Sequence, residues 1–188
     1  MSCQRYHYRT GDLIFQDLDC KLCDAIEHAT SGYQNKPVSH MGMIVVTDSG
    51  TFVLEAYDQV QLISLDTFIK RSEKIMIGRL KKPYRKFIPA AKSRGIKKLE
   101  LPYDDVFRLN NGKYYCSELI YDIFLDENKL PIFEIKPMNF KNLKTGKIDP
   151  VWIEYFQGLG IPVPQGEPGC NPADYSKSDK IHIIKIAY

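Results

Sequence analysis

Two apolar stretches near the amino end constrain the fold more than any other feature of the chain. Residues 38–46 (VSHMGMIVV) and 51–57 (TFVLEAY) are separated only by the turn sequence TDSG. Apolar, β-branched segments joined by such a turn are typical of a β-hairpin. If Thr47 pairs with Gly50 across a two-residue loop, the pairing along both strands follows, because side chains alternate between the two faces of a sheet. Residues 38–57 are therefore expected to form two paired strands.

Further elements are predicted on both sides of the hairpin. Short apolar runs predict strands at residues 11–15, 60–65, 75–80 and 180–187. Helical periodicity predicts helices at residues 17–30, 65–71, 83–94, 116–125 and 151–159. Asp17 or Asp19 is expected to cap the first of these helices, and Gly95 to follow the third, while residues 171–174 predict a turn. Because the strands are grouped and do not alternate with helices, the pattern indicates an α+β fold.

The size and composition of the chain favour one domain spanning residues 1–188. A hydrophobic content of 44% and a charged content of 26% exclude a disordered or fibrous chain. No apolar run approaches the roughly 18 residues that predict a transmembrane helix, so none is expected. The first residues show no apolar core of a secretory signal, so the expected location is cytoplasmic unless such a signal was removed. The oligomeric state does not follow from the sequence.

The charge distribution gives a weak indication of partners. The formal net charge is +3, which does not predict a nucleic-acid partner. Residues 81–98 hold eight basic side chains and no acidic one. Such a segment can meet an anionic wall polymer, a lipid surface or a nucleic acid, although a solvated helix face is the favoured interpretation.

The spacing of the cysteines does not match a recognisable disulfide pattern. There are five of them, namely Cys3, Cys20, Cys23, Cys116 and Cys170. An odd number at irregular spacing favours reduced thiols in a reducing compartment over a set of disulfides. The CxxC at residues 20–23 lacks the second ligand pair that zinc requires, and it lies inside a predicted helix. No metal and no cofactor are therefore expected.

Two polar residues are out of place in the apolar hairpin. His40 and Glu55 each lie inside a predicted strand, where a buried polar group needs a partner. With Thr47 opposite Gly50, Glu55 falls opposite Gly42, two residues from His40. The two side chains then share one face as diagonal neighbours, about 7–8 Å apart at the backbone and within reach of each other. The hairpin therefore predicts a histidine–carboxylate pair.

Cys116 complements this pair, because it follows a turn-prone stretch and opens an amphipathic helix. The positive end of a helix dipole lowers the pKa of a thiol, and the first amides of the helix can hold an oxyanion. A thiol, an imidazole and a carboxylate are the parts of a cysteine hydrolase. Residue chemistry alone also allows an inert buried cysteine and a satisfied core histidine–glutamate pair.

The ordered set of motifs resembles a known family. The segments GDLIFQ at 11–16, SHMG at 39–42, LEA at 54–56, YD at 103–104 and YCSEL at 115–119 are similar to the YiiX-type group, in the permuted NlpC-like branch of papain-like cysteine hydrolases. The resemblance runs from about Gly11 to Phe124, and a weaker similarity is found around Cys170. In the permuted branch the histidine strand precedes the cysteine helix, as it does here.

The resemblance implies a permuted papain-like (NlpC-type) fold, with an antiparallel sheet or open barrel and the catalytic cysteine at a helix N-terminus. It implies Cys116 as the nucleophile, His40 as the general base and acid, and Glu55 as the third member of the triad. Tyr103 matches a tyrosine that unpermuted relatives carry near the oxyanion. Its hydroxyl can stabilise developing negative charge, although a half-buried packing role fits it as well. Tyr115 and Ser39, beside the cysteine and the histidine, are further candidates for substrate contact.

The expected function is a cysteine amidase or peptidase that forms an acyl-enzyme, most consistent with a small peptide of cell-wall (peptidoglycan) type. One alternative on the same fold is an acyltransferase, thioesterase or lipid esterase, which predicts a wide apolar cleft in place of pockets for charged end groups. The other alternative is a ligand-binding module without catalysis. The expected partner is thus a small peptide or acyl substrate.

Overall fold

A six-stranded antiparallel sheet forms the centre of the computed structural model, which describes residues 6–188. The strands follow the order β4-β3-β2-β1-β5-β8, and the two outer strands do not pair with each other in this part of the chain. Their bounds are β1 Leu13–Gln16, β2 His40–Thr47, β3 Gly50–Ala56, β4 Val60–Ser64, β5 Ile75–Leu80 and β8 Ile181–Ala187. A second sheet pairs β6 Lys136–Pro137 with β7 Pro168–Gly169. The α+β class and the antiparallel sheet are confirmed.

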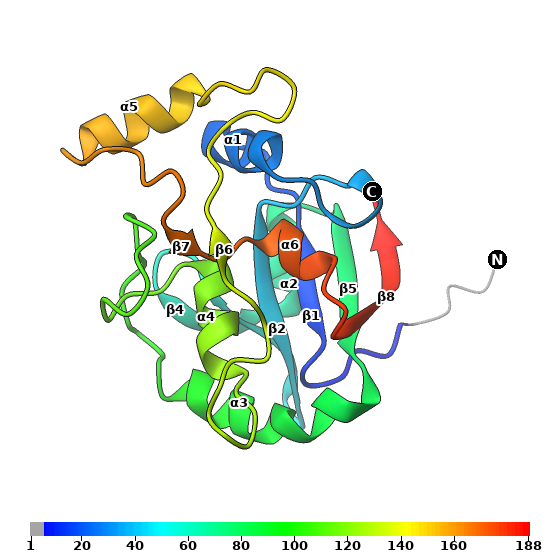
Figure 1. The fold of residues 1–188 in the computed structure, drawn as a ribbon. Helices are drawn as coiled ribbons and strands as arrows, with labels where there is room; N and C mark the ends of the chain where they lie inside the picture. The colour runs from blue at the N-terminus through cyan, green and yellow to red at the C-terminus, as the bar shows by residue number, and fades with distance from the viewer. Residues whose placement is uncertain (1–5) are drawn as a thin grey trace.

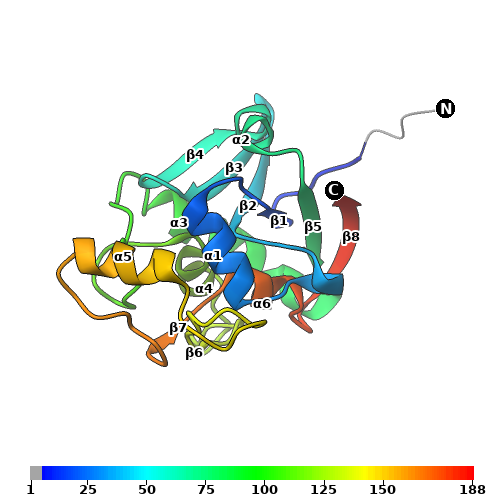
Figure 2. The same ribbon diagram turned by 90° about the horizontal axis from the view of Figure 1, so that it is seen from above.

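Helices lie on both faces of the sheet (Figures 1 and 2). The α-helices are α1 Lys21–Ala29, α2 Leu65–Arg71, α3 Ile88–Ile96, α4 Cys116–Ile123, α5 Pro150–Gly158 and α6 Pro172–Ser176. Short 3-10 turns, η1 Tyr33–Asn35 and η2 Lys82–Phe87, complete the elements. Seen from above, α2 lies on one side of the sheet, while α4 and α6 lie on the other (Figure 2). None of the helices in residues 6–188 is long and apolar enough to cross a membrane.

The hairpin of β2 and β3 has the predicted register. Thr47 pairs with Gly50, and Gly42 pairs with Glu55. The strand β1 pairs with the other edge of β2, so that Gln16 lies opposite His40. Because β2 has neighbours on both edges, most of its residues are buried, which explains its nearly continuous apolar sequence.

The main core lies between the sheet and the helices α3 and α4. Gly95 lies within α3, so the prediction that it follows the helix end was wrong. A Cβ atom at Gly95 would lie 2.2 Å from Cδ2 of Leu54 and 3.6 Å from Cδ1 of Ile123. The glycine is therefore needed where α3 comes close to β3 and α4, not to end a helix.

Two helix boundaries differ from the prediction. The first helix begins at Lys21, and its cap is Cys20, whose sulfur accepts a hydrogen bond from the Cys23 amide; neither Asp17 nor Asp19 caps it. Asp17 is instead buried and pairs with Lys74. The helix predicted at 83–94 is divided into η2 and α3, because Pro89 lacks an N–H and its ring clashes with the carbonyl four residues earlier.

The turn predicted at residues 171–174 is the start of a short helix, α6. The Asn171 side chain accepts a hydrogen bond from the Ala173 amide at 2.8 Å, and Pro172 follows as the first helical residue. Asparagine at the cap and proline directly after it are both favoured at a helix start. Residues 171–174 therefore begin a helix that packs against α4.

The basic segment 81–98 is partly neutralised by the fold. Lys98 pairs with Asp122 at 2.6 Å, and Lys86 pairs with Glu127. Arg94 donates from Nε to the carbonyl of Ile123 at 2.7 Å. Several of these cations therefore hold α3 and its neighbours in place.

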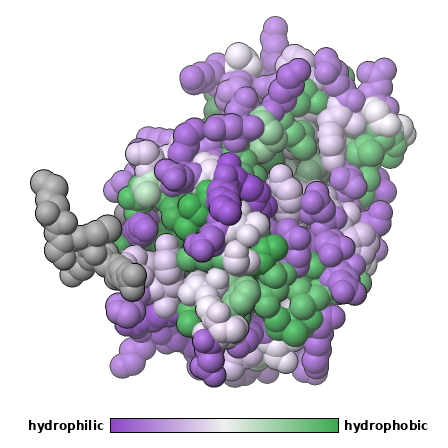
Figure 3. All heavy atoms as spheres, turned by 180° about the vertical axis from the view of Figure 1, so that it is seen from behind, coloured by the Kyte–Doolittle hydropathy of each residue, from purple (hydrophilic) through white to green (hydrophobic). Residues whose placement is uncertain are grey.

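The back of the molecule carries green apolar patches among many hydrophilic side chains (Figure 3). A mixed surface of this kind is usual for a folded protein, because polar groups cannot cover all of it.

A separate apolar cluster lies between α1 and α5 and includes Phe107, Phe140 and Trp152. The cluster also includes Tyr115, the residue directly before Cys116.

Candidate active site

The side chains of His40 and Glu55 lie on the same face of the hairpin, as the register predicts. The Nε2 atom of His40 lies 2.7 Å from Oε2 of Glu55. Both residues are buried, His40 with 4% and Glu55 with 0% of its surface exposed. Gly42 lies opposite Glu55, and a Cβ atom there would lie 2.8 Å from the Leu54 carbonyl oxygen and 3.3 Å from Cβ of Glu55, so a side chain does not fit between the strands at this point. The pair is therefore built by two adjacent strands and depends on no loop.

The other oxygen of Glu55 is held by two further side chains. Arg71, at the end of α2, donates from Nη2 to Oε1 at 2.5 Å, and Gln61 on β4 donates to the same oxygen at 2.7 Å. Burial raises the pKa of Glu55, but the hydrogen bond and charge of His40 and the charge of Arg71 outweigh it and lower that pKa. Glu55 is therefore an ionised carboxylate at neutral pH.

Aromatic rings fix the plane of the His40 imidazole. Phe68 stacks on it with ring centroids 5.7 Å apart, and Tyr57 packs against it edge-on at 5.6 Å. Arg71 lies over the Tyr57 ring, 4.3 Å from its centroid. The same arginine thus holds both the carboxylate and one wall around the imidazole.

Cys116 is the first residue of α4, with Tyr115 as the cap, and 6% of its surface is exposed. The helix α4 packs on β2, the strand that begins with His40, and the Cys116 side chain is near enough to act on the pKa of His40. Burial lowers the pKa of His40, but hydrogen bonds to the Cys116 side chain and to Glu55 outweigh it and raise the pKa to about 9. The raised pKa favours the protonated imidazole in the neutral pH range.

Tyr103 lies close to the thiol. It forms a parallel bridge with Tyr114, whose amide donates to the Pro102 carbonyl at 3.1 Å. Burial, followed by the neighbouring Cys116, raises the pKa of Tyr103 well above its ordinary value. Its hydroxyl therefore keeps its proton and can donate it in a hydrogen bond.

Tyr115 and Ser39 have different surroundings. The Tyr115 hydroxyl accepts a hydrogen bond from the Cys170 amide at 2.9 Å, and burial raises its pKa. The Ser39 hydroxyl is buried and accepts a hydrogen bond from the Leu18 amide at 2.9 Å. Tyr115 borders a pocket described below, whereas Ser39 connects β2 to the turn before α1.

Glu118 lies in the first turn of α4, where its carboxyl is buried. Oε1 accepts a hydrogen bond from the Asn110 amide at 3.2 Å, while Oε2 has no hydrogen-bond partner within residues 6–188. Burial raises the pKa of Glu118 to about 8. A protonated glutamic acid therefore supports the loop that leads into Cys116.

The other cysteines differ from Cys116. A disulfide joins Cys20 and Cys23, so the expectation of reduced thiols was wrong for this pair. The reason is local: Cys20 caps α1 and Cys23 lies in its first turn, which brings the two sulfurs together. Cys170 is free, and burial raises its pKa to about 12. Cys3 lies outside the described residues.

Arg71 and Gln61 were missed by sequence reasoning. The site includes them only because α2 and β4 fold back beside β3, 16 and 6 residues away from Glu55 in the chain. The only available signal was that a buried glutamate needs partners in addition to one histidine. That argument predicts a cation or amide nearby, without saying which one.

An antiparallel sheet that presents a histidine and a carboxylate, followed along the chain by a helix that begins with a cysteine, defines a papain-like enzyme of permuted order. The model of the family described as "Permuted papain-like amidase enzyme, YaeF/YiiX, C92 family" matches residues 7–185. The chain belongs to this family. It is therefore a hydrolase of the papain-like cysteine peptidase and amidase class.

Two relatives extend this comparison. The uncharacterized protein YiiX of Escherichia coli strain K12 is 26% identical over 162 residues, covering 82% of this chain and 76% of YiiX. The crystal structure of the metalloprotein yiiX from Escherichia coli O157:H7 superposes with a TM-score of 0.80 at 21% identity. That match covers 97% of this chain and 99% of the relative. At this identity the structural match demonstrates the shared fold.

Proposed function

We propose that this hydrolase cleaves amide bonds with Cys116 as nucleophile, His40 as general base and acid, and Glu55 as the group that orients the imidazole. The observation that carries the proposal is the buried His40–Glu55 pair, whose Nε2 and Oε2 atoms lie 2.7 Å apart, with the Cys116 side chain near enough to raise the pKa of His40. A raised pKa of His40 favours transfer of the thiol proton to the imidazole. The resulting thiolate at the start of α4 is further stabilised by the helix dipole.

The proposed reaction has two halves. The Cys116 sulfur attacks the amide carbonyl, the C–N bond breaks, and the imidazolium of His40 gives its proton to the leaving amine. Water, deprotonated by His40, then attacks the thioester and releases the carboxylic acid, which returns the thiol. The amide of Cys116 and the hydroxyl of Tyr103 are the proposed donors to the oxyanion in both halves.

The proposed substrate is an amide in a small peptide of cell-wall type. The amidase description of the family supports the amide bond. The buried thiol, 6% exposed, favours a narrow, extended substrate over a folded protein. Acyl transfer, or hydrolysis of a lipid ester or thioester, is the second candidate, and one observation favours it: a pocket with a largely apolar wall beside Cys116.

The description of the solved relative as a metalloprotein raises the question of a metal in this chain. Across residues 6–188, no three or more His, Cys, Asp and Glu side chains form a group that could hold a metal ion. The residues therefore do not fit a bound metal, for which at least three protein ligands are usual.

The test is the rate of Cys116 alkylation by iodoacetamide as a function of pH, followed by mass spectrometry. In the wild type, Cys116 is expected to be alkylated at neutral pH at least about tenfold faster than Cys170, because the thiolate and not the thiol reacts. His40→Ala should slow the alkylation of Cys116 at neutral pH. Cys170 in the same sample is the internal control, because burial raises its pKa and should keep it slow. The proposal would be refuted if Cys116 were alkylated no faster than Cys170 and if His40→Ala left that rate unchanged.

A further inference from the structure

The two cysteines of the CxxC segment lie at the start of α1. Cys20 precedes the first helical residue and Cys23 lies in the first turn, whereas the sequence pattern placed both inside a helix. A disulfide joins them, with Cα atoms 4.9 Å apart. Two cysteines with this spacing at a helix start are the arrangement in which thiol–disulfide exchange is chemically favoured. The function proposed for Cys116 makes no use of this pair, so the pair needs an explanation of its own.

The two cysteines differ in how accessible they are. Cys20 is exposed, whereas only 8% of the surface of Cys23 is exposed. Access decides which sulfur of a disulfide an incoming thiolate attacks. An exchange reaction at this pair therefore has a defined direction, in which Cys20 is attacked and Cys23 is the leaving group.

The cap of α1 stabilises the reduced form of the pair. The Cys23 amide donates a hydrogen bond to the Cys20 sulfur at 3.1 Å. A thiolate accepts such a bond more strongly than a neutral sulfur does, and the positive end of the helix dipole favours its charge. When the disulfide opens, Cys20 therefore remains the cap of the helix as a thiolate, which favours reversible opening.

The charged side chains beside the pair balance one another. Asp19, Lys21 and Asp24 are exposed and lie next to the two cysteines in the chain. Lys74 contacts the Asp19 carboxylate at 3.2 Å, so two acids are matched by two bases. The start of the helix is therefore the main influence on the charge of the Cys20 sulfur.

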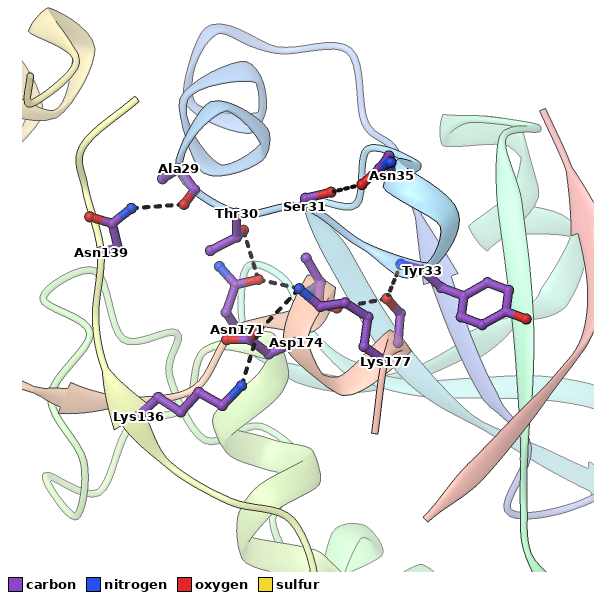
Figure 4. A network of polar contacts seen from close by, with 12 residues as sticks. Ala29, Thr30, Ser31, Tyr33, Asn35, Lys136, Asn139, Asn171, Asp174 and Lys177 are labelled. Carbon is purple, nitrogen blue, oxygen red and sulfur yellow. Dashed lines mark hydrogen bonds and ion pairs between the residues drawn. The ribbon is translucent and has the colours of Figure 1, made fainter. Parts of the chain in front are cut away.

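The helix α1 is held in place by contacts other than the disulfide. At its carboxyl end, the Ala29 carbonyl accepts a hydrogen bond from Nδ2 of Asn139 at 2.8 Å, and Thr30 donates to Asn171 at 3.1 Å (Figure 4). Its apolar face packs against α5. A disulfide between residues three apart in the chain also constrains the unfolded chain less than a long-range one. The pair can therefore open and close while α1 stays folded.

We propose that Cys20 and Cys23 form a second reactive site, which exchanges its disulfide with the thiols and disulfides of a partner independently of Cys116. In the oxidised form, a partner thiolate attacks the Cys20 sulfur, the Cys20–Cys23 bond breaks, and Cys23 leaves as a thiolate. A second partner thiol then displaces Cys20 from the mixed disulfide. Two electrons and two protons thus pass from two partner thiols to the cysteine pair, and the partner becomes a disulfide. In the reverse direction, the reduced pair reduces a disulfide of the partner.

The partner disulfide has two chemical sources, a small thiol compound and a protein. The probes are oxidised glutathione and insulin, each added to reduced protein after the reductant has been removed. The variant Cys23→Ser lacks the second thiol, so it traps the mixed disulfide on Cys20, which peptide mass spectrometry locates. The matched control carries Cys20→Ser, Cys23→Ser and Ser49→Cys, which places a thiol at an exposed position of the turn between β2 and β3.

At pH 7, Cys20 is expected to form the mixed disulfide with at least one probe about threefold or more faster than the control thiol does. The reason is that a larger thiolate fraction outweighs the lower nucleophilicity of a thiolate with a lower pKa. Faster reaction with oxidised glutathione assigns a small thiol compound, and faster reaction with insulin assigns a protein. If Cys20 reacts no faster than the control thiol with either probe, the disulfide is only a structural link and the proposal is overturned.

The wild type supplies a second measurement should Cys23→Ser fail to fold. In the reduced wild type, brief treatment with iodoacetamide at pH 7 should label Cys20 before Cys23, and faster than the control thiol. Untreated reduced protein should instead recover the Cys20–Cys23 disulfide when oxidised glutathione is added. Labelling of Cys20 no faster than the control thiol, or no recovery of the disulfide, would overturn the proposal.

The two proposals fail separately, because each measurement reads a different cysteine. Slow alkylation of Cys116 together with rapid exchange at Cys20 would refute the catalytic proposal and leave the exchange site assigned. Rapid alkylation of Cys116 together with slow exchange at Cys20 would refute the exchange site alone.

Discussion

The guanidinium of Arg71 donates a hydrogen bond of 2.5 Å to Oε1 of Glu55, the carboxylate oxygen that does not face His40. A residue from a helix on one side of the sheet thus positions a carboxylate whose other oxygen orients the imidazole. Because the charge of Arg71 lowers the pKa of Glu55, the arginine also keeps the carboxylate ionised in mild acid. Arg71 is therefore a positioning residue, and its effect is expected in the pH profile.

Arg71→Met is expected to slow alkylation of Cys116 near pH 6 by about tenfold, a barrier change of about 1.4 kcal/mol. Loss of Arg71 raises the pKa of Glu55, so a larger fraction of Glu55 is protonated at a given acid pH. The acid limb of the alkylation rate therefore moves to higher pH. The control is Lys70→Met, which removes an exposed cation from the adjacent position. Identical acid limbs in both variants would show that Arg71 is only a packing residue.

His40 should make folding stability depend on pH. Its folded pKa of about 9 lies above the unfolded value of 6.5. The stabilisation is therefore fully present below pH 6.5 and is lost as the pH rises through about 9. Urea unfolding of wild type and His40→Gln should show a difference in the free energy of unfolding that shrinks by about 1–3 kcal/mol between pH 6 and pH 10. A difference that stays constant would contradict the raised pKa.

Glu118→Gln is expected to stabilise the protein at neutral pH. The folded pKa of Glu118, about 8, lies above the unfolded value of 4.5, so folding takes up a proton at pH 7. That uptake costs free energy, which a neutral amide avoids while still accepting the hydrogen bond from Asn110. The expected gain is about 1–2 kcal/mol at pH 7, reduced for partial solvent screening, and close to zero at pH 4.5.

The matched control for Glu118 is Glu134→Gln, an exposed carboxylate that should give no more than about 0.5 kcal/mol at either pH. Chemical unfolding at pH 4.5 and pH 7 measures both variants. A Glu118→Gln protein that is less stable than wild type at pH 7 would show that the carboxyl is ionised in the folded state.

Gly95→Ala should destabilise the protein although alanine favours helices. The added Cβ would lie 2.2 Å from Leu54, a fully buried side chain next to Glu55, so the core must shift. Overpacking of this kind costs about 1–3 kcal/mol, which exceeds the gain of about 1 kcal/mol in helix propensity. Gly158→Ala at the end of α5 is the control, since no atom lies within 4 Å of its Cβ position. Thermal unfolding should show a lowered midpoint for Gly95→Ala alone.

The local sequence pattern predicted the elements that are set by neighbouring residues. The turn sequence TDSG between residues 38–46 and 51–57 specified the register that places Glu55 opposite Gly42, because a two-residue loop pairs Thr47 with Gly50. The start of α4 at Cys116 was also predicted from local sequence, since helical periodicity begins there. The contact between His40 and Glu55 followed from that register.

The position at which α3 begins was predicted only in part. Pro89 carried the signal for a break, but the basic residues on both sides have the spacing of one helix. Gly95 looked like a stop signal because glycine often ends helices. Its actual reason is the approach of Leu54, which no pattern within the helix records.

The sequence by itself determined the hairpin, its register and the helix that begins with Cys116, because those depend on interactions between residues close in the chain. Only the tertiary structure decided that Arg71 holds Glu55 and that Ile26 and Trp152 share one pocket wall beside Ser117. These residues are far apart in the sequence and meet because the apolar faces of α1, α4 and α5 must be buried together. The energy of that burial is not directional along the chain, so local periodicity holds no record of which partners it selects.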